Sequence, residues 1–292
     1  MTSDPTGVGG GSVAAVVVNF EAGEALSECV ATLRAEGVAE LVVVDNGSGD
    51  GSVDALHRRF PDVEVVTPGF NLGYGAGANR GLAATAAEYV LVCNPDLALA
   101  SGAVPTLVAA LESDPDAALA GPLIRTPEGG RYPSARQFPS LVDAAGHAML
   151  GMFRPSNPFT RAYQRTDLAP AGGVVVPVDW LSGACLLARR TSLEQVGGFD
   201  EAYFMYAEDV DLCWRIAKAG WKVLYVPAAE VTHLQGVSTA RHPYRMILEH
   251  HRSLLRFAER STTGWRRLLL PLVALGIGVR AALAWGRTLA GS

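Results

Sequence analysis

Residues 89–97 read YVLVCNPDL, an apolar run that ends abruptly in an amide, a proline and a carboxylate. The run from Tyr89 to Cys93 predicts a buried strand. Pro95 has no N–H for a sheet ladder, so the strand must end before it, with Asp96 just past the strand end. Asn, Pro and Asp are common turn residues. The stretch is therefore compatible with a plain turn, or with a carboxylate that faces a ligand or a metal.

Strands and helices alternate on both sides of this stretch. We expect strands at 13–18, 41–44, 63–67, 89–93, 117–121, 178–188 and 221–226, and helices at 24–35, 52–60, 105–111 and 208–219, with one more helix that follows the glycine-rich stretch 71–81 and ends at about 87. This alternation is typical of an α/β protein with a parallel sheet. Ligands of such sheets bind beyond the carboxyl ends of the strands. Asp45 and Asp96 both follow strand ends, which favours a functional role for them.

Composition narrows the class of protein. A chain of 292 residues forms one large domain, or one domain with an appendage. Its net charge of −5 indicates no basic surface for nucleic acid. A hydrophobic fraction of 49% is high for a soluble protein, so part of the surface is expected to meet a membrane. The four cysteines form no CxxC pair, which favours a reducing, cytoplasmic compartment.

Three regions differ in character. Residues 1–12 are polar and Gly-rich, so we expect a disordered lead-in and no signal peptide. Residues 13–240 hold the α/β pattern. Within them, 125–178 is predicted to be irregular and carries Arg125, Arg131, Arg136, Arg154, Arg161 and Arg165. Residues 241–292 predict amphipathic helices. Their apolar run, 268–279, is 12 residues long, which is too short to cross a bilayer and favours an interfacial helix over a terminal helix packed on the core.

The glycine-rich stretch 71–81, NLGYGAGANRG, matches a loose dinucleotide-binding pattern. It follows the third predicted strand instead of the first, and no acidic ribose-binding residue ends the next strand. We therefore interpret it as a turn whose backbone lies close to a nucleotide or to another strand.

Seven segments, taken in order, carry a resemblance to a known family. They are VVVNF, VVVDNGSGDGS, NLGYGAGANRG, CNPD, DWLSGAC, GGFDEAYFMYAEDVDLCWR and HLQGVS. Together they resemble family 2 glycosyltransferases of the GT-A fold, and most of all the bacterial cell-wall rhamnosyltransferases. The resemblance covers about residues 13–240. It implies an α/β GT-A nucleotide-diphosphosugar transferase fold, with a mixed, mostly parallel sheet flanked by helices and a C-terminal helical segment. It also implies a nucleotide-sugar donor, a divalent cation and inversion at the anomeric carbon.

The resemblance answers the question raised by residues 89–97. The family's metal motif is a DxD at a strand end, and Asn94-Pro95-Asp96 takes its place here with the first carboxylate replaced by an amide. Asp96 would be the carboxylate ligand of Mn²⁺ or Mg²⁺. His233 matches a position where some members supply an imidazole, which favours Mn²⁺. A loop histidine bonded to the backbone is the alternative for His233.

The resemblance also implies a donor site. Asp45 matches an aspartate that accepts a hydrogen bond from the ring N–H of uracil or thymine. The alternative is an Asx-turn residue. The other residues expected to bind the donor nucleotide are Asn19, Asn71, Gly73, Asn79, Asn94 and Asp96.

On the acceptor side, Asp209 matches the family's catalytic base, which takes the proton of the attacking hydroxyl. Its neighbour Asp211, and in part Glu208, could instead be first-turn acids that favour the helix dipole. The residues expected to bind the acceptor are Trp180, Gly183, Glu208, Arg131 and Arg136. The two arginines would hold a lipid-linked diphosphate, because a guanidinium binds phosphate bidentately.

These implications predict an inverting, metal-dependent transferase that moves L-rhamnose from dTDP-rhamnose to a polyprenyl-diphosphate-linked N-acetylglucosamine. We expect it at the cytoplasmic face of the membrane as a peripheral protein, and its oligomeric state stays open. The alternatives are a UDP-galactofuranose or UDP-hexose transferase and, because of Asn94, a catalytically inactive sugar-nucleotide-binding module. A sugar nucleotidyltransferase is disfavoured, since Asn19-Phe20-Glu21 follows the first strand where that class needs a basic, Gly-rich loop.

Overall fold

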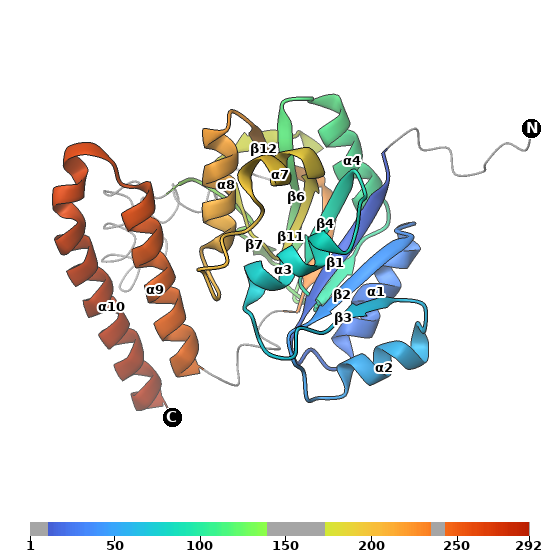
Figure 1. Ribbon diagram of the computed structural model, residues 1–292, viewed down its shortest axis with the longest axis horizontal. Coiled ribbons are helices and arrows are strands. Elements are labelled where there is room, and N and C mark those ends of the chain that lie inside the picture. Colours follow the sequence, from blue (N-terminus) through green and yellow to red (C-terminus); the bar gives the residue numbers. More distant parts are fainter. Residues whose placement is uncertain (1–10, 139–172, 235–242, 292) are drawn as a thin grey trace, which may run out of the picture.

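The structure is a computed structural model that describes residues 11–138, 173–234 and 243–291. Residues 1–10 of the expected lead-in lie outside the described residues, as do Arg154, Arg161 and Arg165. Figure 1 shows an α/β body with two long C-terminal helices standing at one side of it.

A ten-stranded mixed sheet forms the centre of the body, in the order β3-β2-β1-β4-β11-β6-β12-β5, with β7 paired to β6 and β9 paired to β12. The strands are β1 (Val13–Asn19), β2 (Glu40–Asp45), β3 (Glu64–Val66), β4 (Tyr89–Cys93), β5 (Leu97–Leu99), β6 (Ala117–Arg125), β7 (Arg131–Tyr132), β9 (Val176–Val178), β11 (Cys185–Arg189) and β12 (Lys222–His233). Strands β1 to β4 pair in parallel, whereas β11 runs antiparallel to β4 and β6. The sheet is mixed, as predicted.

Helices cover both faces of this sheet. They are α1 (Ala25–Ala35), α2 (Ser52–Arg59), α3 (Tyr74–Ala83), α4 (Ala103–Ser113), α7 (Arg190–Val196) and α8 (Glu208–Lys218). Strand β1 is buried on both sides: Val17 joins the apolar cluster under α1 and α4, and Val16 joins the cluster under α3 and α8. Its unbroken apolar sequence is the pattern of a strand covered on both faces.

The glycines of 71–81 allow α3 to lie directly on the sheet. A Cβ on Gly81 would lie 2.2 Å from Cγ1 of Val16, and one on Gly73 would lie 2.2 Å from the carbonyl oxygen of Phe204. Gly73 also has a φ of 91°, which favours glycine. The close approach that we expected of this stretch is therefore to β1 and to the segment before α8.

Two predicted strands differ from the observed ones. The single strand expected at 178–188 is divided into β9, β10 (Trp180–Leu181) and β11, because the chain leaves the sheet at Ser182-Gly183-Ala184. Strand β10 pairs instead with β8 (Ala135–Arg136) in a small second sheet. Strand β12 continues past the predicted end at Val226, through a bulge, to His233. The predicted irregular segment 125–178 thus contributes β7, β8 and β9 to the described structure.

The C-terminal region is a helical hairpin of α9 (Pro243–Ser261) and α10 (Leu270–Gly291), joined by the 3-10 helix η2 (Gly264–Leu269). Pro271 does not interrupt α10, since it lies in the first turn, where its missing N–H has no helical partner to lose. The apolar stretch Gly264–Ala290 is by length and composition long enough to cross a membrane, so the prediction of a short helix was wrong. None of that stretch is buried, and a core-packed terminal helix is also wrong.

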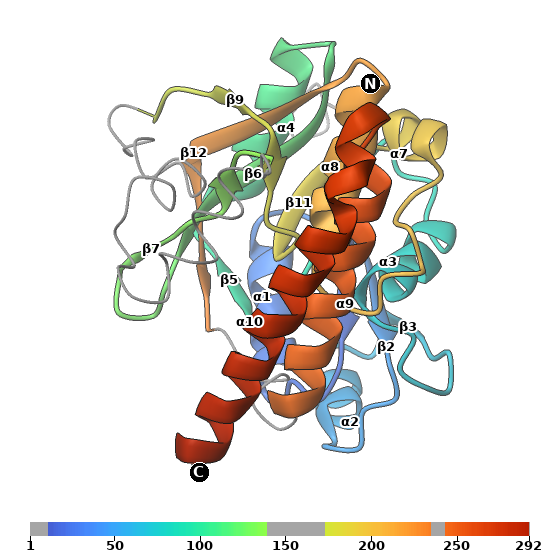
Figure 2. The ribbon, with the colours of Figure 1, turned by 90° about the vertical axis from the view of Figure 1, so that its left-hand side faces the viewer.

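Helices α9 and α10 run side by side, and Figure 2 shows α10 on the outer side of the pair. The rings of Tyr244 on α9 and Trp285 on α10 lie 4.8 Å apart. Trp265, Leu268, Leu272, Leu275 and Leu289 remain exposed on the outer surface. Helix α9 contacts the body, since Ser253 donates to the Met205 carbonyl and Arg256 and Arg260 pair with Asp200.

Candidate active site

A cavity of about 770 Å³ opens between the strand ends of the sheet and the helices α8 and α9. Nine of the site residues predicted from the sequence line this cavity, and they come from six separate segments: Asn71, Asn94, Asp96, Arg136, Trp180, Gly183, Glu208, Asp209 and His233. Asn19, Asp45, Gly73, Asn79 and Arg131 do not line it directly. One wall is formed by strand ends and the other by the first turn of α8 with α9.

Behind the strand-end wall lies a buried polar network at the ends of β1 and β2. The Asn19 amide donates to Asp45 Oδ1 at 2.8 Å and to the hydroxyls of Ser48 and Ser52, each at 3.1 Å. Asp45 Oδ2 accepts the backbone N–H of Ser48 at 3.1 Å, so an Asx turn is present. The buried Asn46 Oδ1 has no hydrogen-bond partner among the described residues. Recognition of a base by Asp45 remains a prediction, and it would have to act from within this network.

Asp96 and His233 meet at the strand-end wall. Strand β12 pairs antiparallel with β5, which places His233 opposite Leu97. Its Nε2 lies 3.1 Å from Asp96 Oδ1 and 3.2 Å from the Asn94 amide nitrogen. Both side chains are buried, and Asp96 Oδ1 accepts no hydrogen bond within the described structure. His233 is a strand residue, and no described hydrogen bond joins its ring to the backbone.

This pair fits a divalent cation. A buried carboxylate oxygen without a hydrogen bond, facing an imidazole nitrogen, supplies two ligand atoms of the kind that Mn²⁺ accepts. In the described part of the chain, no group of three or more His, Cys, Asp or Glu side chains surrounds one point. Substrate phosphates and water would therefore have to complete the coordination, as they often do for such ions.

Asp209 lies in the first turn of α8, on the opposite wall. Its Oδ2 accepts the backbone N–H of Gly183 at 2.8 Å, and its Oδ1 accepts that of Val210 at 2.8 Å. The Tyr74 hydroxyl donates to the Gly183 carbonyl at 2.5 Å and so fixes this turn. A Cβ on Gly183 would lie 3.2 Å from Cβ of Asp209, which explains the glycine. The break between β10 and β11 therefore positions the predicted base.

Glu208 and Asp209 form a pair of neighbouring acids, of which Glu208 is buried and Asp209 is partly exposed. Burial, together with the charge of Asp209, raises the pKa of Glu208 to about 8. Burial also raises the pKa of Asp209, opposed by its two backbone hydrogen bonds. Glu208 Oε2 has no partner among the described residues. We infer that at neutral pH Glu208 holds the proton, and that Asp209, with two N–H donors, is the ionised member.

Two residues before α8 have an unusual backbone. Tyr206 has a φ of 68° and Ala207 a φ of 61°, the left-handed region that disfavours side chains with a Cβ. Each costs on the order of 1 kcal/mol or more. This turn directs the first turn of α8 into the cavity. Sequence reasoning missed it, because neither residue is a glycine or an asparagine.

The remaining predicted site residues form two groups, those that line the cavity and those that do not. Trp180 lines the cavity, donates its indole N–H to the Gln137 carbonyl at 2.9 Å and lies 4.8 Å beneath the Arg136 guanidinium. Arg131 instead lies over the Tyr225 ring at 5.7 Å. Asn79 bonds the backbone of Phe199 through both amide atoms, each at 2.9 Å. The structure therefore places Arg136 in the cavity and gives Asn79 a contact between α3 and the segment after α7.

Sequence reasoning also missed the wall formed by α9. Met246, His250 and Leu254 follow each other at four-residue spacing and face the cavity together with Arg245. The Arg245 guanidinium lies 4.4 Å over the Phe204 ring, and the His250 ring lies 5.1 Å from that of Tyr206. The four-residue spacing was the available signal. It indicates only a helix face, and does not say what that face covers.

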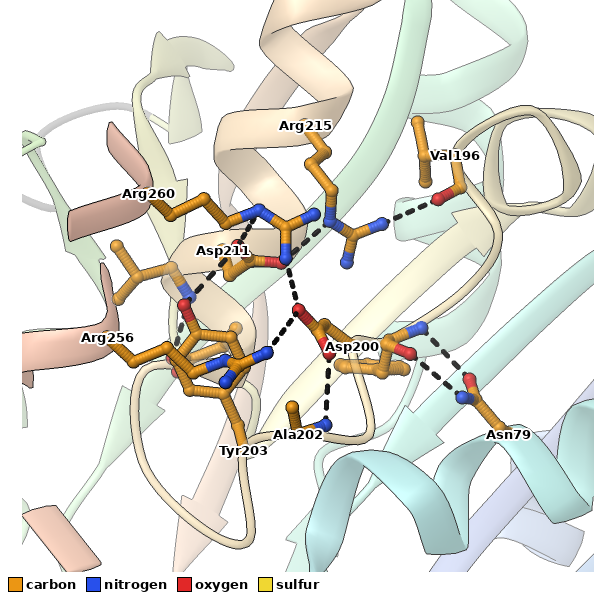
Figure 3. Close-up of polar contacts among 12 residues, drawn as sticks. Asn79, Val196, Asp200, Ala202, Tyr203, Asp211, Arg215, Arg256 and Arg260 are labelled. Atoms are coloured by element: carbon orange, nitrogen blue, oxygen red, sulfur yellow. Dashed lines mark hydrogen bonds and ion pairs between the residues drawn. The ribbon is translucent and has the colours of Figure 1, made fainter. Parts of the chain in front are cut away.

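Figure 3 shows how α9 is held against the body. The fully buried Asp211 accepts from Arg215 Nε at 2.7 Å and pairs with Arg260 Nε of α9 at 3.2 Å. Asp200 pairs with Arg260 as well, and with Arg256 at 3.6 Å. We name Asp200, Asp211, Arg215, Arg256 and Arg260 the clamp. Asp211 therefore has an architectural role beyond that of a first-turn acid.

Comparison with known proteins identifies the family to which the chain belongs. The family model described as glycosyl transferase family 2 matches residues 14–177, and one described as glycosyl transferase family group 2 matches residues 153–287. The N-acetylglucosaminyl-diphospho-decaprenol L-rhamnosyltransferase of Mycobacterium tuberculosis is 43% identical over 265 residues, which cover 86% of this chain and 85% of the relative. The Escherichia coli rhamnosyltransferase WbbL is 26% identical over 228 residues, 75% of this chain and 81% of that protein.

Two solved structures share the fold. One is GalNAc-T7 with UDP, GalNAc and Mn²⁺, with a TM-score of 0.62 and 17% identity, covering 86% of this chain and 48% of that one. The other is the mannosyltransferase PcManGT from Pyrobaculum calidifontis with GDP-Man and Mn²⁺, with a TM-score of 0.59 and 18% identity, covering 100% of this chain and 78% of that one. Both likenesses bear on the fold alone, and they confirm the predicted α/β transferase architecture.

Proposed function

We propose that this chain, which belongs to glycosyl transferase family 2, transfers L-rhamnose from dTDP-rhamnose to the N-acetylglucosamine of a polyprenyl-diphosphate-linked acceptor. One observation carries the proposal: the 43% identity, over 86% of the chain, to a rhamnosyltransferase that acts on N-acetylglucosaminyl-diphospho-decaprenol. The family confirms the glycosyltransferase class predicted from the sequence. The two walls of the cavity supply places for a donor and an acceptor.

Asp209 is the proposed base. As the acceptor oxygen forms its bond to the anomeric carbon, the bond from that carbon to the donor phosphate breaks, and dTDP leaves from the opposite face. The acceptor hydroxyl proton moves to the Asp209 carboxylate, and the anomeric configuration inverts. The backbone N–H groups of Gly183 and Val210 hold that carboxylate toward the cavity. The protonated Glu208 beside it can donate a hydrogen bond to the acceptor sugar.

Asp96 and His233 are the proposed ligands of a divalent cation, with Asn94 held beside His233. Such a cation stabilises the charge that develops on the leaving diphosphate. The donor nucleotide would lie along the strand-end wall, with its base toward Asp45 and its diphosphate toward Asp96. Asn19 holds Asp45 at 2.8 Å and therefore supports the base site from behind.

The hairpin is the proposed membrane contact. Its apolar stretch is long enough to cross a bilayer, but α9 packs beside α10 and carries Arg245, Glu249, Arg252, Arg256, Glu259 and Arg260. Those charges could not enter the hydrocarbon with it. We therefore propose that α10 lies in the membrane interface at the cytoplasmic face, with its exposed leucines and Trp265 toward lipid. Leu272→Glu with Leu275→Glu should abolish co-sedimentation with anionic vesicles, whereas Ala290→Glu near the end of α10 should not.

A donor panel tests the proposed reaction. The purified full chain is incubated with Mn²⁺ or Mg²⁺, a short-chain prenyl-diphosphate-linked N-acetylglucosamine, and dTDP-rhamnose, UDP-galactofuranose or a UDP-hexose. Product mass is read in each case. We expect transfer from dTDP-rhamnose alone, abolished by a chelator. Transfer from a UDP-sugar alone would overturn the proposed donor and favour the UDP-galactofuranose or UDP-hexose alternative. Nucleotide binding without transfer from any donor to any acceptor would favour the inactive module.

A further inference from the structure

We propose that Arg245 of α9 and Arg280 of α10, with the imidazole of His250 and with Arg136 of β8, form a binding subsite for the diphosphate of the lipid-linked acceptor. This inference rests on the proposed function, because it assigns a place to one part of the proposed acceptor. It extends the site beyond the GT-A body and onto the C-terminal hairpin.

The first observation is that several arginines converge on this part of the cavity, and that no acidic side chain of the described hairpin forms an ion pair with Arg245 or Arg280. Arg245 lines the cavity beside His250, and Arg136 lines it from β8. Arg280, on α10, and Arg136 both lie near enough to act electrostatically on His250. None of the ion pairs of the described residues involves Arg245 or Arg280, although Glu249 on the same helix pairs with Arg252. Positive charge gathered in this way favours an anion with several oxygens.

The second observation is that the subsite is built, with its side chains fixed by neighbours. Arg245 is held over the Phe204 ring at 4.4 Å, and His250 stands edge-on to the Tyr206 ring at 5.1 Å. Burial, with Arg280, His251 and Arg136 nearby, lowers the pKa of His250 to about 4. His250 is therefore neutral at physiological pH and can donate one N–H to a phosphate oxygen without adding to the repulsion among the arginines.

The third observation is position. The acceptor has a sugar, a diphosphate and a prenyl chain in sequence, and the structure offers three matching surfaces in the same order. Asp209 and Trp180 line the α8 side of the cavity, and Arg245 and His250 line its α9 wall. Helix α10 lies on the outer side of α9 (Figure 2), and its Leu272 and Leu275 side chains are exposed. The donor diphosphate has a separate place at Asp96 and His233, on the opposite wall.

The test measures binding of geranyl diphosphate, a short-chain prenyl diphosphate without a sugar, to the full chain by calorimetry. The variants are Arg245→Gln and Arg280→Gln. Their matched controls are Arg252→Gln on α9, which is exposed and paired with Glu249, and Arg287→Gln on α10. We expect each test variant to bind roughly tenfold more weakly than wild type, as for loss of one charge-assisted contact, with dTDP binding unchanged. The two controls should bind like wild type.

Two results would overturn the subsite: no binding of geranyl diphosphate by the wild type, or equal weakening in test and control variants. A second readout uses N-acetylglucosamine on an alkyl chain without phosphate. The test variants should lower kcat/KM for the diphosphate acceptor much more than for this phosphate-free acceptor, and the two control variants should lower neither. If geranyl diphosphate binds as expected but no rhamnosyl transfer occurs, the proposed reaction fails and the subsite stands.

Discussion

The two walls of the cavity are held in different ways. The strand-end wall belongs to a sheet buried on both faces, and its side chains are fixed by strand pairing, as when β12 places His233 opposite Leu97. The α8–α9 wall belongs to helices held by side chains: the clamp, the Ser253 hydroxyl bonded to the Met205 carbonyl at 2.9 Å, and the strained turn at Tyr206.

This difference has a functional meaning. A nucleotide diphosphosugar is a small ligand without a lipid chain, and a preformed site at strand ends suits it. A lipid-linked acceptor must enter from a membrane, and a wall that includes a helix of the hairpin proposed to contact the membrane can meet it there. The proposed base, Asp209, is on the wall proposed for the acceptor. We therefore expect substitutions on one wall to affect the donor and metal, and substitutions on the other to affect the acceptor and its deprotonation.

The largest effect is expected for Asp209→Asn. It removes the proposed base and keeps the size of the side chain, although the amide oxygen can accept only one of the two N–H groups, of Gly183 and Val210, that the carboxylate accepts. General-base catalysis contributes about 10²- to 10⁴-fold, so kcat should fall by roughly 10³-fold, with dTDP and Mn²⁺ binding unchanged. The measurement is steady-state turnover together with calorimetric binding of dTDP. Near wild-type turnover would mean that Asp209 is not the base.

The second prediction concerns the clamp. Asp211→Asn should lower the free energy of unfolding by about 3 kcal/mol, because it leaves Arg215 without its carboxylate partner inside the protein. It should also raise the acceptor KM, since Arg260 of α9 shares the same carboxylate. Unfolding in urea and acceptor kinetics measure the two effects.

The matched control for the clamp is Asp114→Asn. Asp114 pairs with Lys222 at 2.9 Å on the surface, far from α9, where an ion pair contributes at most about 1 kcal/mol. Its loss should leave acceptor kinetics unchanged. Equal effects of the two substitutions would show that the clamp does not position the acceptor wall.

The strand-end wall was the more predictable from sequence. Local patterns locate strand ends, so Asp45 and Asp96 could be placed at one edge of the sheet from apolar runs and Pro95 alone. The resemblance added His233, and the structure brings it to 3.1 Å from Asp96. The sequence predicted only the first part of the strand that carries His233, because the bulge after Val226 interrupts the pattern of β12.

The α8–α9 wall was much less predictable. The position of Asp209 was implied by the motif around it, but the turn at Gly183 that holds it appeared in the sequence as the middle of one long strand. Partners such as Arg260 and Asp211 are 49 residues apart, and no local pattern pairs them. The contacts of Arg131 with Tyr225 and of Asn79 with Phe199 were not predicted for the same reason, since they depend on tertiary packing.

The third prediction concerns the strand-end wall. Asp96→Asn should weaken Mn²⁺ binding roughly 10- to 100-fold, equivalent to about 1.4–2.8 kcal/mol, because it removes the one carboxylate of the proposed pair. The KM for the acceptor should not change. Mn²⁺ titration in the presence of dTDP measures the first effect, and Asp209→Asn, on the other wall, serves as the control. Unchanged Mn²⁺ affinity in Asp96→Asn would place the metal elsewhere.

The smallest effect is expected for Glu208→Gln, on the pH dependence of stability. Glu208 in the folded chain has a pKa of about 8, raised by burial from an ordinary value of 4.5. Between these values the folded state holds a proton that the unfolded state has released, so the free energy of unfolding falls as pH rises from about 5 to 8. The amide cannot ionise and removes this slope. Melting temperatures measured from pH 5 to pH 9 should therefore vary less in the variant than in wild type.

At pH 8, Glu208→Gln should raise the free energy of unfolding by on the order of 1 kcal/mol. The increase is no larger because glutamine remains a buried polar group and keeps part of the desolvation cost. The same substitution also tests which acid of the pair is the base. An ionised Glu208 would raise the pKa of Asp209, because the two negative charges repel each other. With glutamine in its place, the acidic limb of the pH–rate profile should stay in place or move to lower pH. A loss of turnover as large as that of Asp209→Asn would mean that Glu208 takes the proton, and that the base lies one residue earlier on the same wall.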